Sequence, residues 1–68
     1  MKSMKVNRIR EVLLEEGKTN NWLARELNIN KVTVSRWCTN TFQPTVDNLL
    51  RIAKVLNVDV RELLVSTK

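Results

Sequence analysis

The segment between Leu27 and Val46 carries the side chains with the most distinctive chemistry. It contains no acidic residue, and it holds two cations, Lys31 and Arg36, among many short polar side chains. Cationic and hydrogen-bonding groups together suit a polyanion that also offers donors and acceptors, such as a nucleic acid. An ordinary solvated surface is the alternative, but exposed helical surfaces usually mix both signs of charge. The formal net charge of +5 has the same sign as this segment.

Other kinds of chemistry lack the residues that they need. The chain has no histidine and no tyrosine, and no carboxylates cluster on an apolar face, so general acid–base catalysis is not expected. The single cysteine, Cys38, has no partner for an internal disulfide, and without histidine a mixed zinc cage cannot form. We therefore expect a protein that is not an enzyme and that binds no cofactor and no metal.

Length and composition predict one small globular domain over residues 1–68. Hydrophobic residues make up 43% of the chain and charged residues 28%, a balance typical of folded proteins rather than disordered ones. No apolar run approaches the roughly 20 residues that cross a bilayer, and the first residues lack the apolar stretch of a secretion signal. These features favour a cytoplasmic protein without membrane contact.

Apolar spacing predicts an all-α fold of five helices. Apolar residues three or four positions apart mark helices over about residues 6–16, 20–27, 31–38, 46–56 and 60–65. The expected core stripe of the first helix is Val6, Ile9, Val12 and Leu13. That of the fourth helix is Val46, Leu49, Leu50, Ala53 and Leu56.

Residues that suit helix boundaries fall between these segments. Short polar side chains accept backbone N–H bonds at helix starts, whereas glycine and asparagine tolerate left-handed dihedrals at helix ends. The predicted starts are at Thr19, Asn30, Thr45 and Asp59, the last in a capping box with Glu62. The predicted ends are at Gly17, Asn28 and Asn57. The turn between the second and third helices is then only about three residues long.

The third helix has few apolar positions to bury. Val34 and Trp37 share one face, and the rest of its surface is polar or basic. Such a helix either packs weakly on the rest of the protein or exposes its polar face to a binding partner. The short turn before it docks it on the second helix, which favours the second alternative.

Three stretches of the sequence form a recognisable pattern, namely Thr19-Asn-Asn-Trp-Leu-Ala-Arg-Glu-Leu-Asn-Ile-Asn-Lys-Val-Thr-Val-Ser-Arg-Trp, then Asn40 with Gln43-Pro44, and Leu49-Leu-Arg-Ile-Ala-Lys-Val-Leu-Asn-Val. With these residues the chain resembles the lambda-repressor-like, Cro/C1-type helix-turn-helix regulators, also called the XRE family. The similarity extends over about residues 6–64. Two positions depart from the pattern, since Asn20 stands where glutamine is common and Asn28 where glycine is common.

The resemblance implies a transcriptional regulator of bacteria or their phages, most simply a repressor, that binds double-stranded DNA. The second and third helices then form the helix-turn-helix, and the third enters the major groove. The expected base contacts are Lys31, Val32, Thr33, Ser35 and Arg36. The expected phosphate contacts are Thr19, Asn20, Asn21, Asn30, Asn40, Thr41, Gln43 and Thr45. Simple solvation is the alternative for each polar loop residue.

A single helix-turn-helix domain contacts only a few base pairs, and specific affinity usually comes from two copies. A homodimer on a palindromic operator is expected, with half-sites about 34 Å apart. The candidate interface consists of Val58, Val60, Leu64 and Val65. The rival function is that of an antitoxin in a toxin–antitoxin pair, whose main partner is a protein but which also binds its own operator. A long disordered tail would favour this rival, and only about four residues follow the last predicted helix.

The two tryptophans have different expected environments. Trp37 is expected in the core, whereas Trp22 either packs against the first helix or stands half exposed. Cys38 is expected to be a buried or half-buried apolar group without a redox role.

Overall fold

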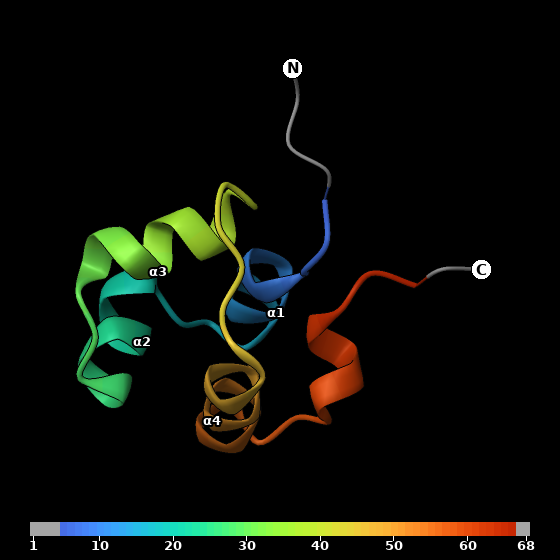
Figure 1. The fold of residues 1–68 in the computed structure, drawn as a ribbon. Coiled ribbons are helices and arrows are strands. Elements are labelled where there is room, and N and C mark those ends of the chain that lie inside the picture. Colours follow the sequence, from blue (N-terminus) through green and yellow to red (C-terminus); the bar gives the residue numbers. More distant parts are fainter. Residues whose placement is uncertain (1–4, 67–68) are drawn as a thin grey trace.

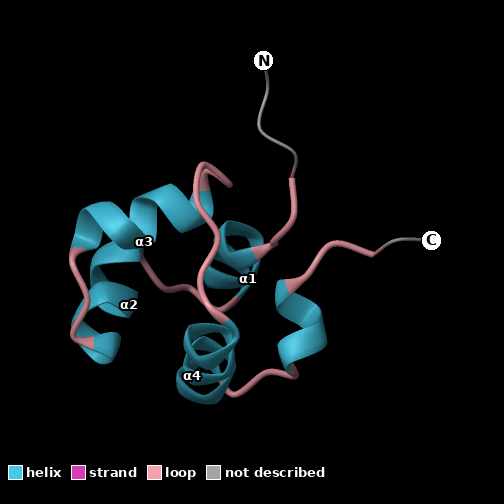
Figure 2. Cartoon of the chain, viewed as in Figure 1, coloured by secondary structure: helices cyan, strands magenta, loops and turns pink. Residues whose placement is uncertain are grey.

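The computed structural model describes residues 5–66, so both ends of the expected single domain, 1–4 and 67–68, lie outside it. The described chain forms four α-helices and one short 3-10 helix (Figure 1). These elements are α1 (Ile9–Glu15), α2 (Asn20–Leu27), α3 (Lys31–Cys38), α4 (Val46–Leu56) and η1 (Val60–Leu63). Loops join them, and no described residue belongs to a strand (Figure 2). The expected all-α fold is confirmed, but the count of five α-helices is wrong.

Every element contributes to one apolar core. The fully buried apolar side chains include Ile9 from α1, Leu23 from α2, Val34 from α3, Ile52 from α4 and Leu63 from η1. In the packing, α2 contacts both α3 and α4, while α1 lies against α3 and η1. Figure 1 shows α2 and α3 on one side of α1 and the C-terminal turn on the other. None of the described helices has the length and apolar character needed to span a membrane.

The predicted caps explain why α2, α3 and α4 have the expected bounds. Thr19 Oγ1 accepts the backbone N–H of Trp22 at 3.0 Å, and Asn30 Oδ1 accepts that of Val32 at 2.7 Å. Thr45 caps α4 in the same way. The predicted left-handed residues are also confirmed, with φ values of 69° at Gly17, 55° at Asn28 and 56° at Asn57.

The first helix begins later than expected. The apolar stripe predicted a helix from about Val6, but α1 begins at Ile9 and ends at Glu15. The backbone N–H groups of Val6 and Asn7 both donate to Asn40 Oδ1, and Asn7 Oδ1 accepts the backbone N–H of Ile9. These bonds hold the chain extended before α1, so Val6 leaves the helix and is exposed.

The last predicted helix is a single 3-10 turn rather than an α-helix over residues 60–65. Asp59 and Glu62 form the predicted capping box, so the start of η1 is confirmed. After Leu63, however, the chain turns to pair with the segment before α1. The Val65 N–H donates to the Val6 carbonyl at 3.0 Å, and the Arg8 N–H donates to the Leu63 carbonyl at 2.8 Å. This pairing stops the helix after one turn.

The buried face of α4 differs from the predicted stripe. Ile52 is fully buried, whereas Val46 is 70% exposed and Leu50 is 52% exposed. The Arg51 guanidinium donates to the Leu27 carbonyl at the end of α2, at 2.7 Å. This bond and the contacts with α2 and η1 turn α4 so that residue 52, rather than residues 46 and 50, faces the core.

Candidate nucleic-acid interface

The surface of α3 matches the predicted division between a core face and a polar face. Val34 and Trp37 are buried, which confirms the core position expected for Trp37. On the other face the helix exposes four of the predicted base-contacting residues and half-buries Thr33. The exposed four are Lys31, Val32, Ser35 and Arg36. Val32 is 51% exposed although it is apolar and β-branched, so folding does not explain its place on the surface.

The turn before α3 fixes this helix against α2. Asn28 takes the left-handed conformation, and the Ile29 N–H donates to the Ala24 carbonyl at 2.9 Å. Asn30 then caps α3. The two helices are therefore joined by a tight turn, and the small buried side chain of Ala24 lets them approach each other.

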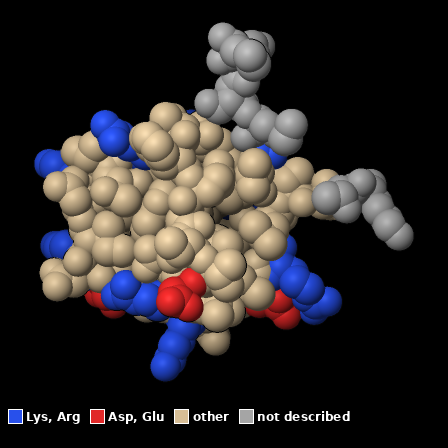
Figure 3. Space-filling model, in the orientation of Figure 1, with Lys and Arg blue, Asp and Glu red and all other residues tan. Residues whose placement is uncertain are grey.

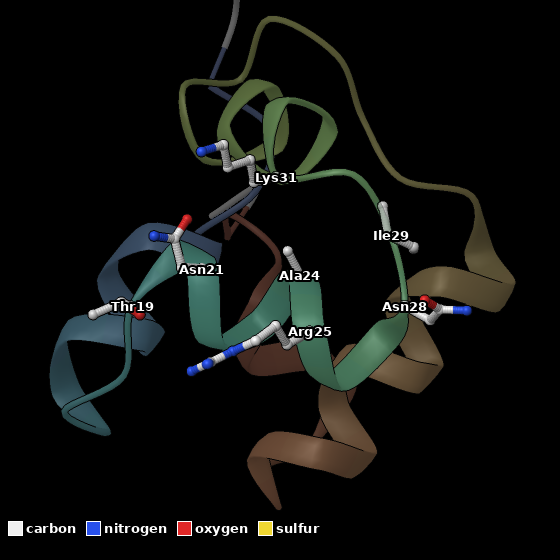
Figure 4. Close-up of a pocket in the computed structure, with 7 residues that line it drawn as sticks. All are labelled: Thr19, Asn21, Ala24, Arg25, Asn28, Ile29 and Lys31. Atoms are coloured by element: carbon white, nitrogen blue, oxygen red, sulfur yellow. The ribbon is translucent and has the colours of Figure 1, made fainter.

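A hollow lies between α2 and the start of α3 (Figure 4). Its lining residues are Thr19, Asn21, Ala24, Arg25, Asn28, Ile29 and Lys31. In Figure 4 the polar ends of Asn21, Arg25 and Lys31 extend to the same side of the molecule. Sequence analysis missed Arg25, although its position four residues after Asn21 places both on one face of α2.

Positive charge on α2 and α3 is not neutralised by neighbouring carboxylates. The ion pairs among residues 5–66 join Lys5 to Glu11, Arg8 to Glu15 and Arg61 to Asp59, all on α1, its flanks or the C-terminal turn. None involves the cations Arg25, Lys31 and Arg36. Figure 3 shows the acidic side chains of the visible face in its lower part, away from α3. The helix-turn-helix surface therefore attracts anions.

The predicted phosphate-contacting residues at the start of α2 differ in the donors that they leave free. Thr19 uses its hydroxyl oxygen for the cap, and Asn21 is exposed. Asn20 is half-buried, and its Oδ1 accepts the Cys38 thiol at 3.3 Å. The Asn20 Nδ2 group has no partner among the described residues, so it can donate to an anion at the N-terminus of α2.

A buried polar network joins the end of α3 to the segment before α1. Asn7 is fully buried, and its Nδ2 donates to the Trp37 carbonyl at 2.9 Å and to Gln43 Oε1 at 2.7 Å. Asn40, with φ of 60°, donates back to the Asn7 carbonyl at 3.2 Å. Sequence analysis did not single out Asn7, because all its hydrogen-bond partners except Ile9 lie 30 or more residues away along the chain.

This network changes the interpretation of Asn40. Its side chain is 8% exposed, and Oδ1 accepts the N–H groups of Val6 and Asn7 and the Gln43 amide. The side chain therefore anchors the loop after α3, and it is not presented to a phosphate. Thr41 and Thr45 are exposed at the same edge, and the Thr41 hydroxyl lies 2.8 Å from that of Thr39.

Phe42 is a second residue that sequence analysis did not single out. Its ring is 57% exposed, and its centroid lies 5.3 Å from Cζ of Arg36. Its backbone N–H donates to the Arg36 carbonyl at 3.3 Å. A lone phenylalanine in a predicted loop gives no periodic signal, so only the three-dimensional arrangement places it beside the α3 arginine.

Trp22 is half-buried and packs against the core, which decides between the two expected environments in favour of partial exposure. The Lys18 ammonium group lies over its ring, 4.9 Å from the centroid. A cation over the ring occupies the face that a stacked base would need.

Cys38 is buried, and burial raises the pKa of its thiol to about 11. The thiol is therefore protonated at neutral pH, and the thiolate is the reactive form. We expect alkylation by iodoacetamide at pH 8 to be at least about 100-fold slower in the folded protein than after denaturation, because two pKa units remove that much thiolate. Mass spectrometry of timed samples measures this ratio, and equal rates would show that the thiol is neither buried nor shifted.

Sequence and structure comparisons agree with this geometry. The model of the helix-turn-helix family matches residues 9–63, which include α2, the turn and α3. The chain belongs to the helix-turn-helix family. Its type is that of the Cro/C1, or XRE-like, regulators, as the resemblance implied. No curated protein matches the chain.

Solved structures of similar fold come from several bacteria. A protein from Bacteroides fragilis, described as a candidate DNA-binding protein, is 47% identical, with a TM-score of 0.88 over 91% of this chain and 100% of the other. The restriction-modification controller protein C.AhdI from Aeromonas hydrophila is 24% identical, with a TM-score of 0.74 over 81% of this chain and 83% of the other. A transcriptional regulator from Listeria innocua is 20% identical, with a TM-score of 0.75 over 96% of this chain and 64% of the other. The last two likenesses show the fold alone.

Proposed function

We propose that this helix-turn-helix protein binds double-stranded DNA in a sequence-specific manner, regulates transcription, and inserts α3 into the major groove. The observation that carries the proposal is the surface of α3. Val34 and Trp37 hold the helix on the core, while Lys31, Val32 and Arg36 point into solvent without a carboxylate partner among residues 5–66. The 47% identical protein from Bacteroides fragilis, a candidate DNA-binding protein, supports the same function.

The exposed side chains of α3 match the groups in a major groove. The Arg36 guanidinium can donate two parallel hydrogen bonds to O6 and N7 of a guanine. Val32 and the methyl group of Thr33 can pack on thymine methyl groups, and the Ser35 hydroxyl can bond to more than one base. Lys31, at the start of α3, reaches either a base or a phosphate.

Phosphate contacts flank α3 on both sides in this arrangement. On one side lie the N-terminus of α2 and the hollow beside it, which supply Thr19, Asn20, Asn21 and Arg25, together with Asn30 at the start of α3. On the other side lie Thr41, Thr45 and Gln43, which is exposed although its amide also bonds to Asn7 and Asn40. The Asn40 side chain is left out of this set because it anchors the loop.

Two copies on a palindromic operator would give the affinity that one module lacks. Leu64 and Val65 are exposed after η1, so these two residues of the expected dimer surface are accessible, whereas Val58 and Val60 are half-buried and pack against the core. Occlusion of a promoter by such a dimer would make the protein a repressor.

Selection of bound duplexes from a random-sequence pool tests the proposed function. We expect an enriched inverted repeat, together with affinities for the selected duplex that fall steeply between 50 and 200 mM salt, two concentrations chosen to isolate the phosphate contacts. Binding that is sensitive to salt but shows no sequence preference would contradict the proposal and favour a protein partner.

Asn20→Ala tests the predicted phosphate contact at the start of α2. Loss of one neutral hydrogen bond to a backbone phosphate should weaken binding to every duplex alike, by roughly 2- to 12-fold. Affinities for the selected duplex and for single-base variants of it measure the effect, with circular dichroism as the control for folding. A loss confined to one base position would show that Asn20 contacts a base instead.

A further inference from the structure

Phe42 and Arg36 form a pair of contacting side chains on the surface of the protein. The ring is 57% exposed, and its centroid lies 5.3 Å from the Arg36 Cζ. Among residues 5–66, the Arg36 guanidinium has no hydrogen-bonded or ion-paired partner, and the Phe42 ring lies next to it. A single exposed apolar side chain is common in folded domains, so the inference rests on the cation over the ring and not on exposure alone.

The backbone under Phe42 is anchored on both sides. Asn40 is tied to Val6 and Asn7, and Gln43 accepts the Asn7 amide at 2.7 Å. The N–H groups of Thr41 and Phe42 both donate to the Arg36 carbonyl, at 3.0 and 3.3 Å. The aromatic ring therefore stands on a fixed loop segment directly beside the last turn of α3.

We propose that Phe42 is a positioning residue for base recognition, which holds the Arg36 guanidinium beside α3 so that its two donors face the major groove. This inference rests on the proposed DNA-binding function. A free arginine side chain samples many rotamers, and ordering it on binding costs affinity. An attractive ring at the right place lowers that cost before DNA arrives.

The magnitude follows from the environment of the pair. A cation over an aromatic face contributes modestly in water and more when the pair is desolvated, as it would be against a DNA groove. We therefore expect Phe42→Ala to lower the affinity for the selected duplex by roughly two- to thirty-fold. The loss should concentrate at the base position that Arg36 contacts, because the phosphate contacts do not depend on the ring.

Three Phe42 variants separate positioning from simple apolar contact. Phe42→Tyr keeps an aromatic face and should retain wild-type affinity and base preference. Phe42→Leu keeps apolar volume but has no π-system, so it should behave like Phe42→Ala. All three variants should have nearly the same unfolding temperature as the wild type, because substitutions at exposed positions usually change stability little.

A double-mutant cycle with Arg36→Ala completes the test. If Phe42 acts through Arg36, then Phe42→Ala should change affinity less than about twofold when Arg36 is already alanine. Full binding by Phe42→Leu, or an undiminished effect of Phe42→Ala in the Arg36→Ala background, would overturn the positioning role. Wild-type protein without any sequence preference would overturn the DNA-binding proposal and this inference together, whereas a specific wild type with an unaffected Phe42→Ala variant overturns only the inference.

Discussion

Arg36→Ala should lower the affinity for the selected duplex by about 1–3 kcal/mol, which is roughly 5- to 150-fold. Its guanidinium is exposed on α3 and has no carboxylate partner among residues 5–66, so the change should remove the proposed two-pronged bond to guanine. The variant should also accept any base at one position of each half-site. Competition between the selected duplex and its single-base variants measures both effects.

Arg61→Ala is the matched control for this variant. It removes one positive charge as well, but Arg61 lies in η1 and pairs with Asp59 at 3.1 Å. Exposed pairs of this kind contribute little to stability, and the side chain is far in sequence from α3. We expect its base preferences to equal those of the wild type. An Arg36→Ala protein that is folded and keeps the wild-type preferences would show that another residue recognises that base.

Asn7→Ala should lower the free energy of unfolding by about 2–4 kcal/mol, more than the alanine substitutions of Asn20, Asn21, Arg36 and Arg61. The Asn7 side chain is fully buried, donates to the Trp37 carbonyl and Gln43, and accepts the Ile9 N–H. Truncation leaves the buried Ile9 N–H without its acceptor and removes one donor from Gln43 Oε1 and from the Trp37 carbonyl, which keeps the Asn40 N–H. For a domain of this size, the midpoint of thermal unfolding should fall by about 10–25 °C.

Asn21→Ala serves as the control for stability, because Asn21 is exposed and takes no part in the network. Its free energy of unfolding should differ from that of the wild type by less than about 0.5 kcal/mol, as is usual for surface substitutions, so its thermal midpoint should hardly change. Equal midpoints for Asn7→Ala and Asn21→Ala would contradict the view that the network holds the loop after α3 in place.

Local signals made the three central helices predictable from the sequence. Thr19, Asn30 and Asn28 act on backbone groups within a few residues of themselves, so their residue types alone indicate where α2 and α3 begin or end. The division of α3 between the buried Val34 and Trp37 and an exposed polar face follows from helical periodicity. These features place most of the predicted base contacts correctly on the surface.

Long-range contacts explain the features that the sequence did not predict. The chain before α1 is extended because Asn40 accepts its N–H groups, and η1 is short because Val65 pairs with Val6. The rotation of α4 depends on a bond from Arg51 to the end of α2. None of these pairings leaves a periodic pattern in either segment alone.

The candidate site itself shows the same division. The α3 residues could be predicted from spacing and resemblance, whereas the burial of Asn40 and the ring of Phe42 beside Arg36 depend on how the loop folds back. Arg25 is an intermediate case. Its position on α2 could be predicted from the sequence, but the fact that it lines the hollow between α2 and α3 could not.

Methylation interference on the selected duplex tests most directly whether α3 occupies the major groove. Dimethyl sulfate modifies guanine N7, which faces the major groove, and adenine N3, which faces the minor groove. We predict that methylation of one guanine in each half-site prevents binding of the wild type and that Arg36→Ala, assayed at higher protein concentration, no longer responds to that guanine. Interference from adenine N3 alone would place the protein in the minor groove and contradict the account.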